Sequence, residues 1–326
     1  MTLATPGTPS TPGGGSAAAG KDVRSGTTAT RSLRSRRAVQ WKAYLYLLAP
    51  LAVVTALLVV PLGQAVQISL YRWDGLSPST WAGVSNYADL GRDPVLRSGF
   101  LHALVLIGFY AVLPVCVALF LAGAMTRATR LRGASVFRVL LFLPQVLATV
   151  VVATAWTAIY APDGVLNSLL EAIGLHTLTR PWLGDFSTAL PAVGLIGTWL
   201  ELGLCLVLFL SGIGSIPREL YEAAKVDGAG AVREFVTVTL PGLRGQITVA
   251  LTLTVIAALR TFDLVYVTTR GGPGNATAVP SFEIYDRAFN TGQVGEACAL
   301  GVVMTLLILA ITVLIDRLQP REDDHA

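Results

Sequence analysis

Few residues of this sequence are placed to make or break covalent bonds. The stretch 15–21, GSAAAGK, nearly matches the GxxxxGK loop that cradles phosphates, but Asp22 stands where a Ser or Thr would meet magnesium. No strand-like segment precedes it, so we interpret it as a chance match. The three histidines, His102, His176 and His325, fall on different segments. We therefore expect no catalytic residues, no metal site and no cofactor bound by this chain.

Three charged residues, Glu201, Arg260 and Asp263, stand in or beside long apolar runs, where ionised groups are costly and usually functional. Arg260 and Asp263 are three residues apart on one predicted helix and could pair. A structural ion pair and a transport role therefore stay equally open. Aromatic and amide side chains in similar runs could line a sugar path, because aromatic faces stack on sugar rings: Gln145, Trp156, Tyr160 and Trp199. For any one of these, helix packing or an interfacial aromatic belt is the simpler explanation.

Charge is concentrated in one loop, Gly214–Gly245, which holds four basic and four acidic residues. Pro217 is expected at the first position of a short helix, and Gly228 is expected to end it in a left-handed turn. A second short helix, with Phe235 on one face, should end at Pro241. Two short helices joined by a glycine turn can lie along a membrane surface and fit a groove on a cytoplasmic partner.

The elements that must carry these residues are membrane helices. Charged residues make up 13% of the 326, whereas soluble proteins carry about 25%. The hydrophobic fraction is 53% and the mean hydropathy is +0.62, which excludes an ordinary soluble domain. A span needs about 20 apolar residues. Six runs meet that need: Tyr44–Leu70, Gly99–Thr126, Val139–Pro162, Phe186–Pro217, Gly245–Leu259 with a continuation to Thr269, and Ala297–Ile315.

Basic residues predict the orientation of these helices. Of the 24 Lys and Arg residues, seventeen lie in the N-terminal tail and in the segments on its side of the membrane, and six lie on the opposite side. The last, Arg260, lies within the fifth span. By the positive-inside rule both termini are cytoplasmic. We expect four parts: a disordered basic tail (1–40), a first span with its outer loop (41–97), a core transmembrane domain (98–316) and a short cytoplasmic tail (317–326).

The spacing within the charged loop resembles a known motif. It is similar to the EAA loop of binding-protein-dependent ABC importers through Glu222-Ala223-Ala224, Asp227-Gly228-Ala229, Phe235 and Leu240-Pro241. A bare EAA triplet would fit an ordinary surface helix with a glycine cap, but the full spacing from Glu222 to Pro241 favours a coupling loop. Residues 215–221, SIPRELY, resemble the lead-in of maltose-type sugar permeases. Four further segments resemble the same family: Leu143-Pro144, Trp182-Leu183-Gly184-Asp185, Phe262-Asp263 and the GGPGN at 271–275.

The resemblance covers roughly residues 44–316, with one departure at Gly245, where many members carry a second proline. It implies an all-α integral membrane protein with six transmembrane helices and the fold of a type I ABC importer permease. It also implies import of a sugar or related polyol across a bacterial plasma membrane. In that family the EAA loop is the coupling helix that docks on the ATPase.

The implied partners are a second homologous permease, a cytoplasmic ABC ATPase dimer that holds ATP and magnesium, an extracytoplasmic solute-binding protein and membrane lipids, but no nucleic acid. Three alternatives remain. A secondary transporter would show matched repeats, and none is evident. An ABC permease for a non-sugar solute fits the same motif. A membrane enzyme would need a catalytic cluster, which the sequence does not offer.

Overall fold

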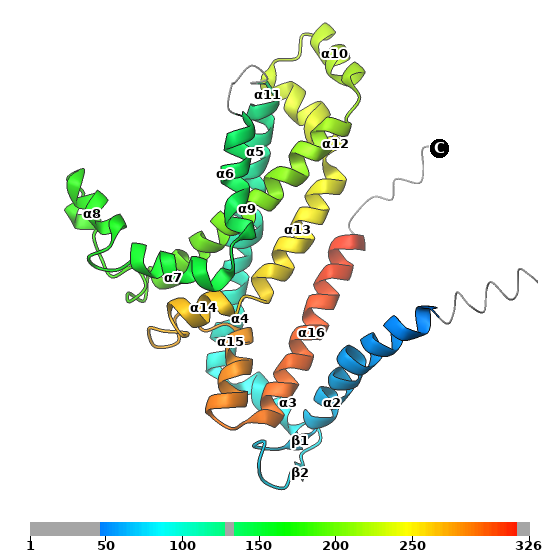
Figure 1. Cartoon of the computed structure of the whole chain (residues 1–326), viewed down its shortest axis with the longest axis vertical. Coiled ribbons are helices and arrows are strands. Elements are labelled where there is room, and N and C mark those ends of the chain that lie inside the picture. Colours follow the sequence, from blue (N-terminus) through cyan, green and yellow to red (C-terminus); the bar gives the residue numbers. More distant parts are fainter. Residues whose placement is uncertain (1–45, 128–133, 318–326) are drawn as a thin grey trace, which may run out of the picture. The chain divides into compact units, whose positions relative to one another are not determined.

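The structure is a computed structural model that describes residues 46–127 and 134–317, which are mostly helical (Figure 1). The predicted tail 1–40 and residues 318–326 lie outside the described residues. Residues 61–326 form one compact unit and the chain up to Val60 another. The α-helices are α2 (Val60–Ile68), α3 (Ser85–Arg92), α4 (Pro94–Ile107), α5 (Leu113–Arg127), α6 (Ala134–Val146), α7 (Thr149–Ile159), α8 (Val165–Ala172), α9 (Ala189–Ser215), α10 (Arg218–Val226), α11 (Ala231–Glu234), α12 (Leu240–Gly242), α13 (Arg244–Leu259), α14 (Asp263–Thr268), α15 (Pro280–Tyr285) and α16 (Val294–Arg317).

Short helical turns of other kinds and one hairpin complete the described structure. The π-helical turns are η1 (Thr55–Val59), η2 (Gly108–Val112), η4 (Phe235–Thr239) and η5 (Asp286–Asn290), and η3 (His176–Leu178) is a 3₁₀ turn. The strands β1 (Tyr71–Arg72) and β2 (Thr80–Trp81) pair antiparallel, with Tyr71 opposite Trp81.

Four helices of the described chain are long and apolar enough to cross a membrane, and two bent pairs bring the number to six if each pair is one span. The four single helices are Tyr46–Ile68, Pro94–Met125, Ala189–Ser215 and Val294–Arg317. They agree with the first, second, fourth and sixth apolar runs. The domain boundaries predicted at residues 40, 97 and 316 stay a prediction.

The third apolar run is interrupted by a sharp bend, and a second bend lies directly before the fifth run, which itself forms the helix α13. The third is bent by 109° between Val139–Val146 and Thr149–Ile159. Pro144 lies in the last turn of α6, where it removes a backbone donor, and Ala148 is extended before α7 begins. The fifth run, α13, joins Ala231–Gly242 at a 70° bend. Apolar composition indicates that a segment lies within the membrane but not the direction of its helix axis, so neither bend could be predicted from it.

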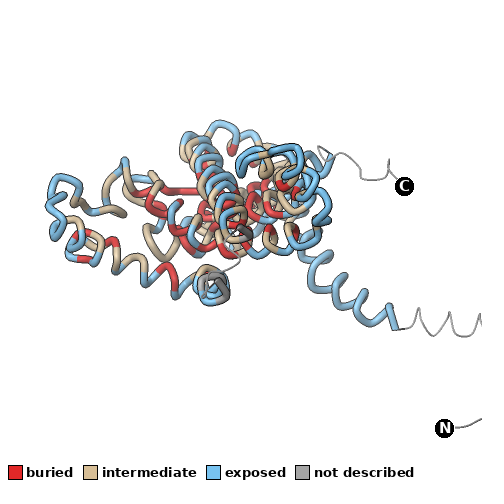
Figure 2. Tube along the Cα trace, turned by 90° about the horizontal axis from the view of Figure 1, so that it is seen from above, coloured by how far each residue is buried: buried red, intermediate tan, exposed pale blue. Residues whose placement is uncertain are grey.

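The core of residues 61–317 is built around α9, a helix of 27 residues, which packs against α5, α6 and α13. Figure 2 shows the buried residues gathered along the middle of the helices, with exposed residues around them. Small residues let the backbones approach closely. A Cβ at Gly197 would lie 1.9 Å from the Tyr110 ring of η2, and one at Gly203 would lie 2.4 Å from the Leu141 carbonyl of α6. The positions of these two glycines therefore fix how α9 meets its neighbours.

A partly buried ionic network joins α4, α16 and the consecutive elements α15 and η5 at the end of the bundle opposite α10 (Figure 1). Arg287 of η5 bonds Asp93, the N-cap of α4, and Glu296 in the first turn of α16 at 2.7 Å. Glu283 of α15 lies 3.6 Å from Nε of the same guanidinium. Arg287 and Asp93 are 194 residues apart, so no local sequence pattern announces the pair.

The pKa values of two carboxyl groups of this network, both outside the spans, shift in opposite directions. Burial acts to raise the pKa of Asp93, but the hydrogen bond and charge of Arg287 and the Val95 N–H outweigh it and hold that pKa below its usual range. Burial raises the pKa of Glu283, and the more distant Arg287 only partly offsets it. Asp93 is therefore the stronger ionic partner of Arg287.

Candidate functional site

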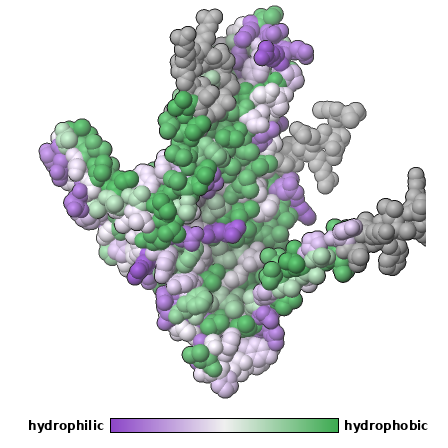
Figure 3. Space-filling view, viewed as in Figure 1, coloured by the Kyte–Doolittle hydropathy of each residue, from purple (hydrophilic) through white to green (hydrophobic). Residues whose placement is uncertain are grey.

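A small cavity brings together the three charged residues that the sequence places at membrane depth. Its volume is about 150 Å³, and its walls come from η2, α7, α9 and the break between α13 and α14. Glu201 is buried in the middle of α9, whereas Arg260 and Asp263 are exposed at the break. In Figure 3 a strongly hydrophilic patch interrupts the apolar surface beside α14. The remaining lining residues are Tyr110, Thr149, Leu200, Ala257, Thr261, Phe262 and Leu264.

Arg260 and Asp263 lie on different helices, so the expectation that they share one helix is wrong. Arg260 caps the C-terminus of α13, Thr261 and Phe262 are non-helical, and α14 begins at Asp263. The carbonyl of Thr261, released by the break, accepts a hydrogen bond from the Ser281 hydroxyl of α15. Buried carbonyls need such a partner inside a membrane. The break therefore points two charged residues at the cavity without leaving that carbonyl unpaired.

Three of the four side chains proposed for a sugar path lie together, and the fourth does not. The Trp156 ring centroid is 5.2 Å from that of Tyr160 and 5.6 Å from that of Trp199. Trp156 and Tyr160 also line a second cavity of about 300 Å³, together with Trp182. Gln145 lies on an exposed part of α6 and lines neither of these two cavities.

Sequence reasoning missed Asn167, which fixes the aromatic wall of the second cavity. It is 3% exposed and accepts a hydrogen bond from Nε1 of Trp182 at 2.8 Å. Its amide nitrogen donates to the carbonyls of Pro162 and Arg180, both at 3.0 Å. A single buried asparagine in the short helix α8 has no spacing signature, so only the folded structure reveals this role.

The charged loop forms two short helices, as predicted, with a Schellman turn between them. Gly228 has φ +69°, its N–H donates to the Lys225 carbonyl at 3.0 Å, and the Ala229 N–H donates to the Ala224 carbonyl at 2.9 Å. Glu222, Ala223, Asp227 and Gly228 are exposed, and Ala224 and Ala229 are half-buried. Pro217 caps α10 instead of forming its first residue. Figure 3 shows the surface at α10 as hydrophilic.

The second helix of the loop continues past the position where it was expected to stop. Pro241 lies inside α12, and the helical segment Ala231–Gly242 ends one residue later. Proline is tolerated there because it is near the start of a new helical turn, where its missing donor is not needed. Leu240 and Pro241 thus lie directly before the 70° bend into α13.

One contact ties this helix pair to the rest of the chain, and another joins its two halves. The Phe235 ring lies against α5 so closely that a Cβ at Gly123 would be 2.9 Å from its Cε2. The hydroxyls of Tyr221 and Thr239 are 3.2 Å apart, which joins α10 to η4. α10 itself contains no buried residue. The helix pair is therefore anchored through its second half, while α10 stays open to solvent or a partner.

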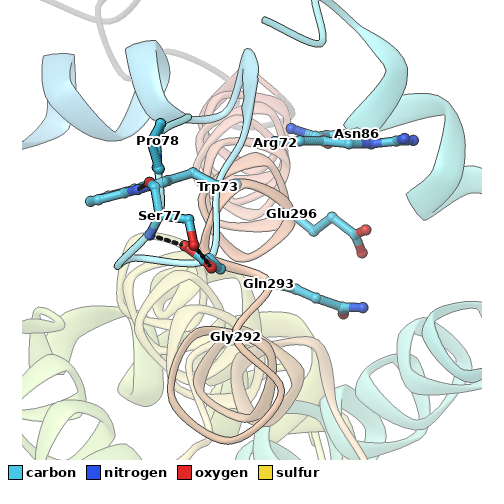
Figure 4. A pocket seen from close by; sticks show the side chains of 10 residues that line it. Arg72, Trp73, Ser77, Pro78, Asn86, Gly292, Gln293 and Glu296 are labelled. Carbon is cyan, nitrogen blue, oxygen red and sulfur yellow. Dashed lines mark hydrogen bonds between the residues drawn. The ribbon is translucent and has the colours of Figure 1, made fainter. Parts of the chain in front are cut away.

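A third cavity, of about 310 Å³, lies between the β1–β2 hairpin, α3 and the start of α16 (Figure 4). Arg72 and Glu296 line it, and Asp74 accepts hydrogen bonds there from the N–H and hydroxyl of Ser77, both at 2.7 Å. Asn86 donates to the Ser69 carbonyl at 2.7 Å and to the Tyr71 carbonyl at 2.9 Å, which holds the hairpin on α3. This cavity is polar and separate from the charged one.

Comparison with known proteins identifies the family to which these sites belong. A model of the family described as "Binding-protein-dependent transport system inner membrane component" matches residues 115–323. The chain belongs to this family. The matched residues include the whole helix pair and all charged residues of the first cavity. The protein is thus a permease, a transport subunit in the inner membrane, rather than a soluble binding module.

Named relatives extend the match over most of the permease. It is 37% identical over 277 residues to the "Probable ABC transporter permease protein YurN" of Bacillus subtilis, covering 83% of this chain and 93% of that protein. It is 34% identical to the "Diacetylchitobiose uptake system permease protein NgcF" of Streptomyces coelicolor, covering 91% and 87%. It is 32% identical to the "Trehalose/maltose transport system permease protein MalF" of Thermococcus litoralis, covering 83% and 90%.

A solved structure shows the same fold for the permease. A chain of a bacterial ABC transporter involved in the import of the acidic polysaccharide alginate matches with a TM-score of 0.73 and 23% identity, covering 87% of this chain and 97% of that one. The all-α fold of an ABC importer permease, predicted from the sequence, is therefore confirmed.

Proposed function

We propose that this permease carries a sugar or related polyol inward across a bacterial plasma membrane and is driven by ATP hydrolysis on separate subunits. The names of the relatives support the solute class, since two of them refer to uptake or transport of disaccharides. In this proposal each bent helix pair counts as one span, which gives six spans. Both termini then lie in the cytoplasm, in line with the distribution of basic residues.

The observation that carries the proposal is the exposed helix pair from Glu222 to Pro241. Val226 and Val232 on it are 88% and 77% exposed, and Leu220 is also exposed. Apolar side chains on a polar surface helix are typical of a contact that a partner covers. We infer that an ABC ATPase dimer, which holds ATP and magnesium, takes this helix pair into a groove.

The contacts of the helix pair provide a route from the ATPase to the solute. Phe235 presses on α5 at Gly123, and α5 continues through η2, where Tyr110 faces the charged cavity. A displacement of the helix pair on ATP binding therefore moves a wall of the cavity through one continuous helix. Rigid helices carry such a displacement with little loss because protein interiors are closely packed.

The charged cavity is the proposed solute site of this chain. Carboxylates of Glu201 and Asp263 accept hydrogen bonds from sugar hydroxyls, and Arg260 donates to them. Trp156 and Tyr160 offer ring faces in the second cavity, and Trp199 packs on Trp156. A second homologous permease would close the pathway, and a solute-binding protein outside the cell would deliver the solute. The core transmembrane domain of this arrangement is residues 98–316.

Reconstitution tests this function. The full transporter, with its second permease, ATPase subunits and binding protein, is placed in proteoliposomes and offered maltose, trehalose and N,N′-diacetylchitobiose. We expect ATP-dependent uptake of at least one of them. Arg260→Gln should slow that uptake roughly 10- to 100-fold, because it removes a charged hydrogen-bond donor. Arg244→Gln, an exposed arginine at the other end of α13, is the control. Uptake that persists without ATP under an ion gradient would instead indicate a secondary transporter.

A further inference from the structure

Four aromatic side chains form a continuous row on α14, α15 and η5. The Tyr285 centroid lies 5.2 Å from Phe289, 5.1 Å from Tyr266 and 5.2 Å from Phe262, and the Phe262 and Tyr266 rings are stacked at 5.3 Å. Two i, i+4 pairs on facing helices build it, Phe262 with Tyr266 and Tyr285 with Phe289. We call these four residues the aromatic row.

The aromatic row connects the surface with the charged cavity. At one end Phe289 is 76% exposed, in the turn before α16. At the other end Phe262 lines the cavity between Arg260 and Asp263. Tyr285 lies between them and contacts both, and Tyr266 packs beside Phe262 and Tyr285; both tyrosines are half-buried. The row therefore begins at an exposed ring and ends at the proposed solute site.

We propose that the aromatic row is a path along which sugar rings reach the charged cavity. This inference rests on the proposed function. Aromatic faces bind the C–H face of a sugar ring, and a series of such faces binds successive rings without holding any of them tightly. The hydroxyls of Tyr266 and Tyr285 share one hydrogen bond of 3.5 Å, and the O–H and lone pairs that this bond does not use can bind sugar hydroxyls.

The loop after α14 gives the row one cationic edge. The Arg270 guanidinium lies 5.9 Å from the Tyr266 ring centroid. Arg270 has φ +49°, and its N–H donates to the Val265 carbonyl at 2.9 Å, which holds this backbone conformation. Non-glycine residues in this region cost energy and concentrate at functional sites. A guanidinium at this edge can donate to the hydroxyls of a ring stacked on Tyr266.

Packing accounts for part of the row, because Phe262 and Tyr266 lie against the main hydrophobic cluster, but it does not account for Phe289. Phe282, on the same helix as Tyr285, is 7% exposed and belongs to the main hydrophobic cluster, which shows how a core aromatic is placed here. Phe289 packs on Tyr285 but presents most of its surface outward. An aromatic belt would spread its residues around the protein at one depth, whereas these rings follow one another toward a cavity.

The test uses the full transporter in proteoliposomes, with the sugar that the wild type imports. Phe289→Leu and Tyr285→Leu remove ring faces from the row. Phe120→Leu, in α5 and 74% exposed, is the matched control. We expect each row variant to lower sugar uptake at subsaturating concentration by roughly three- to tenfold, because an aromatic contact contributes about that much. Binding-protein-stimulated ATP hydrolysis should stay at the wild-type rate, and Tyr285→Phe should retain most of the uptake.

The outcomes separate this inference from the function on which it rests. Wild-type rates of uptake in both leucine variants would overturn the row as a path while leaving the importer assignment intact. A parallel fall of ATP hydrolysis and uptake would also overturn it, because the rings would then serve assembly or coupling. Absence of ATP-dependent sugar uptake by the wild type would overturn the proposed function, and this inference with it.

Discussion

Gly228 offers a direct test of the coupling segment. Within the permease only its backbone conformation restricts which residue can stand there, whereas a docked ATPase would also restrict the size of the side chain. Its φ of +69° costs an alanine about 1–2 kcal/mol, whereas asparagine and aspartate tolerate the left-handed region better. No atom of the described chain lies within 4 Å of a Cβ built there. Within the chain alone, Gly228→Ala should therefore be the most harmful substitution, and it should favour the frayed turn about 5- to 30-fold.

A groove on the ATPase reverses that order. A docked turn leaves little room for a larger side chain, so Gly228→Asp and Gly228→Asn should lose more uptake than Gly228→Ala. We expect Gly228→Asp to abolish ATP-driven uptake and to weaken copurification of the ATPase, while the permease still inserts in the membrane. Gly230→Ala is the control, since Gly230 has φ −71° and is also exposed.

The assay is uptake into inverted or right-side-out vesicles, with the ATPase quantified after affinity purification of the permease. Normal transport by Gly228→Asp would refute the coupling role of the loop. If instead uptake is lost in the order of backbone strain, with Gly228→Ala losing the most, docking at this turn is refuted. The loop would then need only the left-handed conformation of the turn.

The remaining predictions concern the helix contacts and the ionic network. Phe235→Ala should uncouple ATP hydrolysis from uptake without preventing ATPase binding. Gly123→Ala should have a weaker effect of the same kind, because its methyl group displaces the Phe235 ring without removing it. If both variants bind the ATPase as the wild type does and also couple hydrolysis to uptake normally, the route through α5 is contradicted. Asp93→Asn keeps the helix cap and removes the charge opposite Arg287, so we expect a loss of about 2 kcal/mol in unfolding free energy at pH 7, measured by thermal unfolding in detergent. The depressed pKa of Asp93 means that its contribution is present above about pH 4 and is lost as the pH falls further, so the variant should be less acid-sensitive than the wild type. Glu283→Gln should cost little or stabilise at pH 7, since the raised pKa of Glu283 marks a carboxylate that burial disfavours; a cost equal to that of Asp93→Asn would show that the three carboxylates act as one unit.

The sequence predicted the apolar runs and the helix pair well, because both depend on local composition and spacing. Gly228 adopts the left-handed turn expected of it, and the ends of α9 fall within three residues of the predicted run. The bend after Val146 was not predictable, because apolar residues on both sides of it look like one span. The break at Thr261 carries no glycine or proline, and its carbonyl depends on Ser281, twenty residues away.

The candidate site likewise has parts that the sequence predicts and parts that only the structure reveals. Glu201, Arg260 and Asp263 could be named from the cost of charge in an apolar run, and the structure places them around one cavity. Gln145 was named on chemistry alone and lies elsewhere. The aromatic row has a local signal, two pairs of aromatic residues four apart, but only the approach of α14 and α15 joins the pairs.

The contact between Gly197 and Tyr110 determines how much room the charged cavity has. Tyr110 lines this cavity, and its ring also rests on the bare backbone of α9. Any residue larger than glycine at position 197 must displace the ring and so reshape a cavity of about 150 Å³. Under the proposed function, a single small residue that does not touch the solute would thereby limit the size of the solute that this site accepts.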